Sequence, residues 1–170
     1  MNKSIKEAIT IQSSNSEVWK ILSAPSHLEL FHPFCKRNTP LSWNDSENKL
    51  DEIEYLNGLV YKRVFRAWEK HSFSLTIVQR EKSIAHVEWI LSEASSSTKV
   101  EIIVYPFNSN QPKILYPALF FFYIRPKLKH YLKSVLGGLK YYVENKKETP
   151  RNILGKHSWY SWPLKRTLYN

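Results

Sequence analysis

The stretch LKHYLKSVLGGLKYYV, residues 128–143, decides the fold. Its apolar side chains recur at spacings of three and four, which is the pattern of an amphipathic helix with one face on a core. We therefore expect a long helix that lays one face on the rest of the domain. The apolar face is formed by Leu128, Leu132, Val135, Leu136, Leu139, Tyr142 and Val143, and the opposite face carries Lys127, Lys129, Lys133 and Lys140.

Gly137 and Gly138 fall in the middle of this expected helix. Alanine would be favoured there by about 1 kcal/mol per residue, so a pair of glycines calls for a reason. Two interpretations stay open. The pair marks a local bend, or it allows a close approach of helix and sheet or leaves room for a ligand.

Upstream of the helix the apolar period changes to two, as in half-buried strands. Short polar turns separate the runs, so neighbouring strands should pair antiparallel. Asn57-Gly58 is the strongest turn signal and predicts a type I′ hairpin. About seven strands are expected, at 5–12, around 41–43, around 53–55, and at 59–69, 73–80, 84–92 and 98–105.

Two short helices are expected between the first and second strands. Residues 13–16 (Ser-Ser-Asn-Ser) supply N-cap chemistry for the first, which Pro25 ends. Ser26 is expected to cap the second, which runs towards Phe34. The resulting order of strand, two short helices, strands and long helix predicts an α+β helix-grip domain. In it an antiparallel curved sheet of about seven strands wraps around the C-terminal helix and encloses an apolar cavity.

These segments together resemble the SRPBCC superfamily, the helix-grip fold of START domains, birch-pollen-allergen-like (Bet v 1-like) proteins and polyketide cyclase/dehydrase-like bacterial proteins. The resemblance covers residues 5–146 in order and implies a cavity for lipids, sterols, polyketides or plant-hormone-like molecules. It transfers no catalytic residue to this sequence. The segments that carry it are Ile9-Thr10-Ile11, residues 16–22 (SEVWKIL) with Pro25, residues 87–91 (VEWIL), residues 98–102 (TKVEI) and the helix 128–143.

The chain divides at its last helix. Residues 1–146 are expected to form the ligand-binding domain, and residues 147–170 a basic, aromatic tail that packs on the domain or on a partner. Prolines and a glycine interrupt the tail, and its large rings are too apolar to stay in water. The tail interleaves Trp159, Tyr160, Trp162 and Tyr169 with Arg151, Lys156, Lys165 and Arg166.

The composition of the 170 residues predicts a soluble cytoplasmic protein. The single cysteine, Cys35, excludes an internal disulfide framework and is expected to be an ordinary partly buried thiol. The N-terminus lacks the apolar core of a signal peptide, and no apolar run is long enough to cross a bilayer. His27 and His32 are five apart with no companion ligand, so neither a metal nor another cofactor is expected.

Nine residues are predicted to touch a small hydrophobic or amphipathic ligand between sheet and helix. Arg63 is the polar candidate among them, and two interpretations of it stay open. If the row of Tyr61 faces inward, Arg63 is a cation in an apolar cavity that a ligand carboxylate or phosphate could neutralise. Otherwise it lies on the outer face and pairs with a neighbouring acid. The predicted ligand residues are Phe31, Phe34, Tyr61, Arg63, Phe65, Phe73, Trp89, Leu132 and Leu136.

An enzyme of the cyclase or dehydratase type is the alternative. His86 and Glu88 share one face of a strand and could act as an acid–base pair if that face lined the cavity. The other row of the strand is more apolar, which favours an outer, solvated position for the pair.

A second alternative is a lipid handler that docks on membranes. Residues 111–170 hold 12 Lys/Arg against Glu144 and Glu148, whereas residues 1–110 balance 13 against 13. Aromatic residues beside basic ones suit shallow insertion into an anionic membrane, or else they cover the cavity entrance. Nucleic acid is not expected as a partner, because no nucleic-acid-binding motif accompanies the charge, and no pattern indicates an oligomeric state. The predicted surface comprises Phe120, Phe121, Phe122, Arg125, Lys127 and Lys129.

Overall fold

The computed structural model describes residues 4–44, 49–107 and 116–162. The predicted turn at 45–48, most of the connection at 106–117, and the tail residues Lys165, Arg166 and Tyr169 lie outside these ranges.

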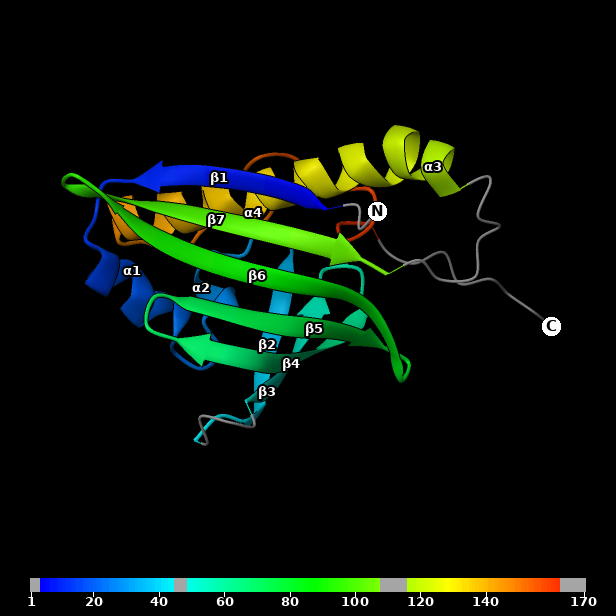
Figure 1. Cartoon of the computed structure of the whole chain (residues 1–170), viewed down its shortest axis with the longest axis horizontal. Coiled ribbons are helices and arrows are strands. Elements are labelled where there is room, and N and C mark those ends of the chain that lie inside the picture. The colour runs from blue at the N-terminus through cyan, green and yellow to red at the C-terminus, as the bar shows by residue number, and fades with distance from the viewer. Residues whose placement is uncertain (1–3, 45–48, 108–115, 163–170) are drawn as a thin grey trace.

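Seven antiparallel strands form one curved sheet in the order β1-β7-β6-β5-β4-β3-β2 (Figure 1). Only β1 leaves its place in the chain order, because it pairs with the last strand. The expected number and pairing of strands are therefore confirmed. The strands are β1 (Ile5–Ile11), β2 (Cys35–Ser42), β3 (Leu50–Tyr55), β4 (Val60–Glu69), β5 (Ser72–Gln79), β6 (Lys82–Ala94) and β7 (Ser97–Pro106).

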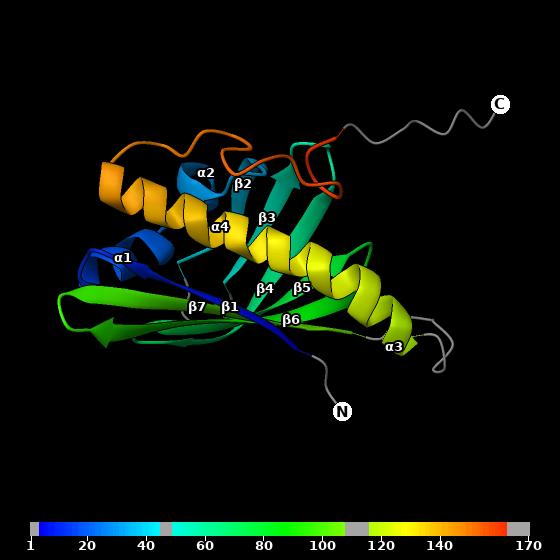
Figure 2. The same ribbon diagram turned by 90° about the horizontal axis from the view of Figure 1, so that it is seen from above.

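The long C-terminal helix lies along the concave side of this sheet, next to β1 (Figures 1 and 2). Two short helices, α1 (Asn15–Leu22) and α2 (Leu28–Phe31), follow β1. The long helix starts earlier than its periodicity predicts, because a helical turn and a π-helical stretch precede it without a break. Its parts are α3 (Tyr116–Leu119), the π-helical segment η1 (Phe120–Ile124) and α4 (Arg125–Asn145). This arrangement is the helix-grip architecture.

The glycine pair allows close approach, but not to the sheet. A Cβ at Gly138 would lie 2.2 Å from the carbonyl oxygen of Phe31 in α2, and a Cβ at Gly137 would lie 2.3 Å from Cδ1 of Leu154 in the tail. The helix is continuous across the pair. The glycines therefore let α2 and the tail sit directly on α4.

The structure differs from the prediction at the start of α2 and at the turn between β3 and β4. His27, not Ser26, occupies the N-cap position of α2, which ends at Phe31 after a single turn. In the β3–β4 turn Gly58 has a φ of +87°, but Asn57 does not have the positive φ that a type I′ turn needs. Asn57 instead uses its side chain, donating from Nδ2 to the carbonyl of Trp159 at 2.7 Å. Tertiary contact with the tail replaces the expected turn geometry.

Strand β2 begins at Cys35, several residues before its alternation becomes visible. It includes Pro40, which cannot donate a backbone hydrogen bond. Because β2 is an edge strand, one side of it needs no partner, and the proline is tolerated.

The described part of the tail packs along the domain. Thr149 donates its backbone N–H to Leu30 and its hydroxyl to the carbonyl of Gly138, at 2.9 and 2.7 Å. Thr149 is buried, and so are His157 and Tyr160 further along the tail. The tail thus crosses α2 and α4 and reaches the β3–β4 turn (Figure 2).

One end of the space between sheet and helices is filled by large aromatic rings. Trp68 stacks on Phe73 with centroids 5.2 Å apart, and Trp43 meets Phe65 edge-on at 5.3 Å. Trp19 from α1 joins them at 5.6 Å from Trp68. Rings of this size bury large areas and leave little free volume there.

Candidate ligand cavity

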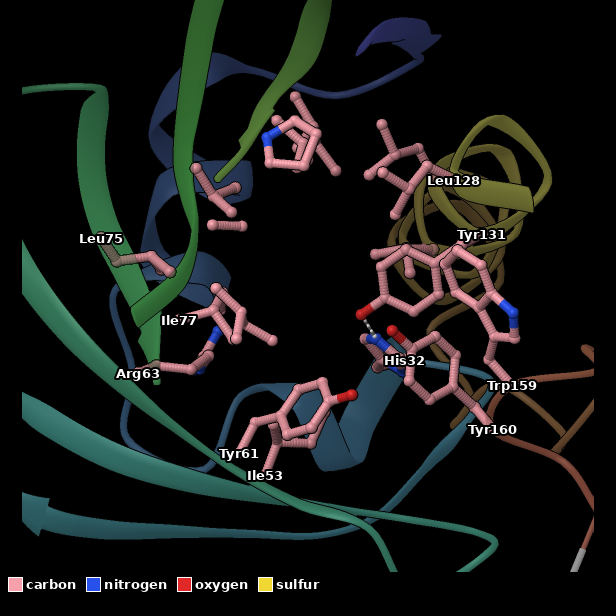
Figure 3. Close-up of a pocket in the computed structure, with 18 of the residues that line it drawn as sticks. His32, Ile53, Tyr61, Arg63, Leu75, Ile77, Leu128, Tyr131, Trp159 and Tyr160 are labelled. Atoms are coloured by element: carbon pink, nitrogen blue, oxygen red, sulfur yellow. Dashed lines mark hydrogen bonds between the residues drawn. The ribbon is translucent and has the colours of Figure 1, made fainter. Parts of the chain in front are cut away.

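A cavity of about 280 Å³ lies at the other end of the same space, between the sheet, α4 and the tail (Figure 3). Its lining is mainly aliphatic and aromatic. The aliphatic residues are Leu28, Ile53, Leu75, Ile77, Ile84, Ala85, Val87, Ile102, Val104, Pro106, Ile124, Leu128, Leu132 and Val135; the others are His32, Tyr55, Tyr61, Arg63, Trp89, Tyr131, Trp159 and Tyr160.

The cavity exists because short side chains face the helix at this end of the strands. Ile77, Ala85, Val87 and Val104 occupy the positions across from α4. None of them reaches as far as the tryptophans that fill the aromatic end. The same sheet is therefore packed at one end and hollow at the other.

Four of the nine predicted ligand residues line this cavity, namely Tyr61, Arg63, Trp89 and Leu132. The other five belong to the packed core instead. The two ends of a strand differ in what lies opposite them, which the alternation of apolar residues does not report. The five core residues are Phe31, Phe34, Phe65, Phe73 and Leu136, each at most 5% exposed.

Arg63 faces inward and is already paired. It is 5% exposed, and its Nε donates to Oδ1 of Asp51 at 2.7 Å while Nη2 donates to Oδ2 at 2.5 Å. Asp51 lies directly opposite on β3 and is fully buried. Both earlier interpretations need correction: the cation is inside, as in the first, but a neighbouring acid neutralises it, as in the second.

His27 completes this ionic group as a neutral acceptor. Its Nδ1 lies 2.7 Å from the carbonyl of Ala24, so Nδ1 carries the proton. Its Nε2 then accepts from Nη2 of Arg63 at 3.3 Å. Burial, with the Arg63 charge beside it, lowers the pKa of His27 to about 3. Burial opposes ionisation of Asp51, but the charge and hydrogen bonds of Arg63 outweigh it and lower the pKa of Asp51.

A second group of hydrogen-bonded side chains links α2 to α4 and β3. The ring of His32 accepts from the backbone N–H of Phe34 at Nδ1, 3.2 Å, so its Nε2–H donates to the Tyr131 hydroxyl at 2.9 Å (Figure 3). The Tyr131 hydroxyl also contacts that of Tyr55, at 3.0 Å. Burial lowers the pKa of His32 to about 3.

The tyrosines of the cavity stay protonated. Burial raises the pKa of Tyr55, Tyr131 and Tyr160 above the ordinary value for a phenol. With neutral histidines, protonated tyrosines and a matched ion pair, the cavity carries no net charge at neutral pH.

No protein-family model and no curated protein matches the chain by sequence. Solved structures do match it in shape. The Zhui aromatase/cyclase from Streptomyces sp. R1128 is 8% identical, with a TM-score of 0.67, and the match covers 85% of this chain and 94% of that one. The likeness extends over the whole helix-grip fold of this chain.

Two further helix-grip structures match over similar lengths. The di-domain aromatase/cyclase BexL from the BE-7585A biosynthetic pathway is 14% identical, with a TM-score of 0.63, over 84% of this chain and 50% of that one. Ara h 8.0201 is 12% identical, with a TM-score of 0.59, over 84% and 98% of the two chains. At these identities the likeness concerns the fold.

Several cavity residues were not among the predicted ligand residues, and their places in the fold show which signal was available for each. Tyr131 lies three residues after Leu128, on the apolar side of the helix, so the helical spacing could have predicted its position. Tyr55 follows Ile53 in the same strand row. Trp159 and Tyr160 belong to an irregular segment, for which no periodicity predicts a position.

His86 and Glu88 lie on the outer face of the helix-grip sheet. Nε2 of His86 is 3.5 Å from Oε1 of Glu88, and the two side chains are 30% and 34% exposed. Neither lines the cavity, where Val87 and Trp89 of the other row are found. The proposed acid–base pair is therefore not in the cavity.

The predicted basic aromatic surface divides at Phe120. Phe120 is 2% exposed and points inward, because the π-helical segment presents one face to the core. Phe121, Phe122 and Tyr123 are 50%, 85% and 50% exposed. Lys129 reaches Glu7 at 3.6 Å, and Arg125 lies over the ring of Phe121 at 5.9 Å.

Cys35 is fully buried, and burial raises the pKa of its thiol to about 12. Within the described ranges, no helix is long and apolar enough to cross a membrane. The same residues contain no group of three or more His, Cys, Asp or Glu side chains that could hold a metal ion.

Proposed function

We propose that the protein binds a small hydrophobic or amphipathic molecule in the cavity between the sheet and α4. The observation that carries the proposal is a hollow of about 280 Å³ with a mainly apolar lining. Ligand sites typically measure about 300–1,000 Å³ and have apolar walls with a few polar groups. A volume near the lower limit favours a compact ligand of a few rings.

The protonation states in the cavity suit binding. Protonated tyrosines can orient a ligand by hydrogen bonds without exchanging protons with it near pH 7. Most of the affinity then comes from apolar area removed from water, at about 25 cal/mol per Å² before the costs of association are subtracted. Two of the structures that match in fold are aromatase/cyclases, which supports the use of this fold for binding a small molecule.

A fluorescence titration with the neutral dye N-phenyl-1-naphthylamine tests the proposal. Ala85 on β6 lines the cavity, so Ala85→Phe adds a ring to the hollow and removes nothing from the fold. The matched control is Ala67→Phe, at an exposed position on β4. We expect saturable one-to-one binding that Ala85→Phe weakens at least tenfold and Ala67→Phe leaves unchanged. Equal binding by both variants would show that the dye does not use the cavity.

As a second candidate function, we propose that the exposed end of the long helix docks on anionic membranes. The carrying observation is three adjacent aromatic residues, Phe121, Phe122 and Tyr123, all at least half exposed, next to Arg125. Ile124 and Leu128 within the same turns line the cavity, so a docked membrane would face its edge. The excess of lysine and arginine in residues 111–170 complements an anionic lipid surface.

Co-sedimentation with phosphatidylserine-containing vesicles tests this candidate. Binding should need the anionic lipid, weaken with added salt, and fall at least fivefold in Phe121→Ser/Phe122→Ser. The matched control is Leu41→Ser/Val60→Ser, which removes two exposed apolar side chains from the sheet. Absence of salt-sensitive binding, or an equal loss in both double variants, would contradict membrane docking through this end.

A further inference from the structure

The hydroxyls of Tyr55 and Tyr131 hold one more proton than their mutual contacts use. His32 donates Nε2–H to the oxygen of Tyr131, and a single contact of 3.0 Å joins the two hydroxyls. Either tyrosine can donate in that contact, but each carries one O–H. One hydroxyl proton is therefore left over, and both side chains line the cavity. The pair presents a hydrogen-bond donor there whichever way its protons are arranged.

Arg63 supplies a second donor from the opposite side. Its Nε and Nη2 are used by Asp51 and His27. Nη1 has no hydrogen-bond partner among the described residues, yet it is not one of their fully enclosed unpartnered atoms, so it keeps accessible surface in a residue that lines the cavity. Figure 3 shows Arg63 and Tyr131 on opposite sides of the hollow, with the Tyr131 hydroxyl directed into it.

The charge balance decides what kind of acceptor fits between these donors. Asp51 already neutralises Arg63 with two hydrogen bonds. A ligand carboxylate would bring an extra negative charge into an apolar space close to Asp51, at a large desolvation cost. A neutral carbonyl accepts the same hydrogen bonds without that cost.

We propose that the cavity selects an uncharged, mainly apolar ligand with a carbonyl-type acceptor, held between Nη1 of Arg63 and the hydroxyl pair of Tyr55 and Tyr131. This inference rests on the proposed ligand-binding function and narrows its ligand class. It replaces the acidic ligand that an inward arginine alone suggests.

Three naphthalene derivatives of nearly equal size test the selection. They are 2-isopropylnaphthalene, 2-acetylnaphthalene and 2-naphthoate, measured at pH 7 by displacement of N-phenyl-1-naphthylamine and by calorimetry. Each net hydrogen bond is worth about fivefold in affinity, so the ketone should bind about 25-fold more tightly than the hydrocarbon. It should also bind at least tenfold more tightly than the carboxylate.

Tyrosine-to-phenylalanine variants test the proton count. Tyr55→Phe and Tyr131→Phe should each keep most of the ketone preference, because one hydroxyl remains to donate. The double variant should lower the preference over the hydrocarbon to about fivefold, the share left to Arg63. Tyr142→Phe, on α4 but outside the cavity lining, is the control and should match the wild type.

The outcomes separate this inference from the function on which it rests. If the hydrocarbon and the ketone bind equally, the cavity binds ligands but the donor pair is not used, and the inference is wrong. Tightest binding by naphthoate would overturn the selection for a neutral ligand. If no derivative binds, the proposed function fails as well. These wild-type ratios decide the matter even if the double variant does not fold.

Discussion

The cavity has two parts that are built on different principles. Its polar part contains His32, Tyr55, Arg63 and Tyr131, whose orientations are fixed by hydrogen bonds to one another and to buried partners such as Asp51. Its apolar part, around Ile77, Ala85, Val87 and Val104, has no such bonds. The polar part can therefore specify a ligand's chemistry, whereas the apolar part sets only its size. The same contrast predicts which substitutions the fold tolerates.

The largest effect should come from breaking the ion pair of the polar part. Arg63→Met leaves the carboxylate of Asp51 buried without its cation, which costs about 3–5 kcal/mol of unfolding free energy. Urea denaturation measures the loss. The control Arg66→Met, at an exposed position on the same strand, should cost less than about 1 kcal/mol.

The double variant Asp51→Leu/Arg63→Met sharpens this test. Removing both charges takes away the unpaired carboxylate, so most of the lost stability should return. A loss below about 1 kcal/mol in the single variant would mean that the pair is not buried as described.

The next effect is a dependence of stability on pH. His27 and His32 have pKa values of about 3 in the folded protein and about 6.5 in an unfolded chain. Between these values the unfolded state binds more protons, so stability falls as pH is lowered below 6.5. Each histidine contributes a slope of up to about 1.4 kcal/mol per pH unit.

Denaturation between pH 7 and 5 measures this slope. His27→Gln should remove about half of the contribution that His27 and His32 make together. A wild-type stability that is constant over this range would contradict the buried, neutral histidines.

The smallest effect is expected in the apolar part. Ile77→Val removes one methylene that borders the hollow, so little packing is lost, and the cost should be near the lower limit of about 0.5 kcal/mol. The same change at Ile11, which is fully buried in the packed core, should cost about 1–1.5 kcal/mol. Equal costs in thermal denaturation would indicate that Ile77 is packed on all sides.

The sequence predicts the helix-grip fold well because periodicity reports which face of an element is buried. The seven strands and the long helix follow from it. Periodicity does not report what lies across from a buried residue, so Phe65 and Phe73 looked like cavity residues although they fill the aromatic end. It also could not pair Arg63 with Asp51, because that contact depends on strand register.

The path of the tail is a second feature that could not be predicted from the sequence. Its aromatic content indicated that it would not extend into water, but the irregular backbone gave no register for placing Trp159 and Tyr160 at the cavity. Their positions depend on backbone contacts such as that of Asn57 N–H with the carbonyl of Tyr160 at 3.0 Å. Contacts of this kind arise only once the domain has folded.

Ligand binding in the cavity is tested most directly by mapping where a ligand contacts the protein. Backbone amide shifts of the isotope-labelled protein would be followed during titration with 2-acetylnaphthalene. We expect saturable changes at the cavity lining on β5, β6 and α4, and their loss in Ala85→Phe. Changes confined to Phe121–Tyr123, or identical changes in Ala85→Phe, would contradict the claim that the cavity is the ligand site.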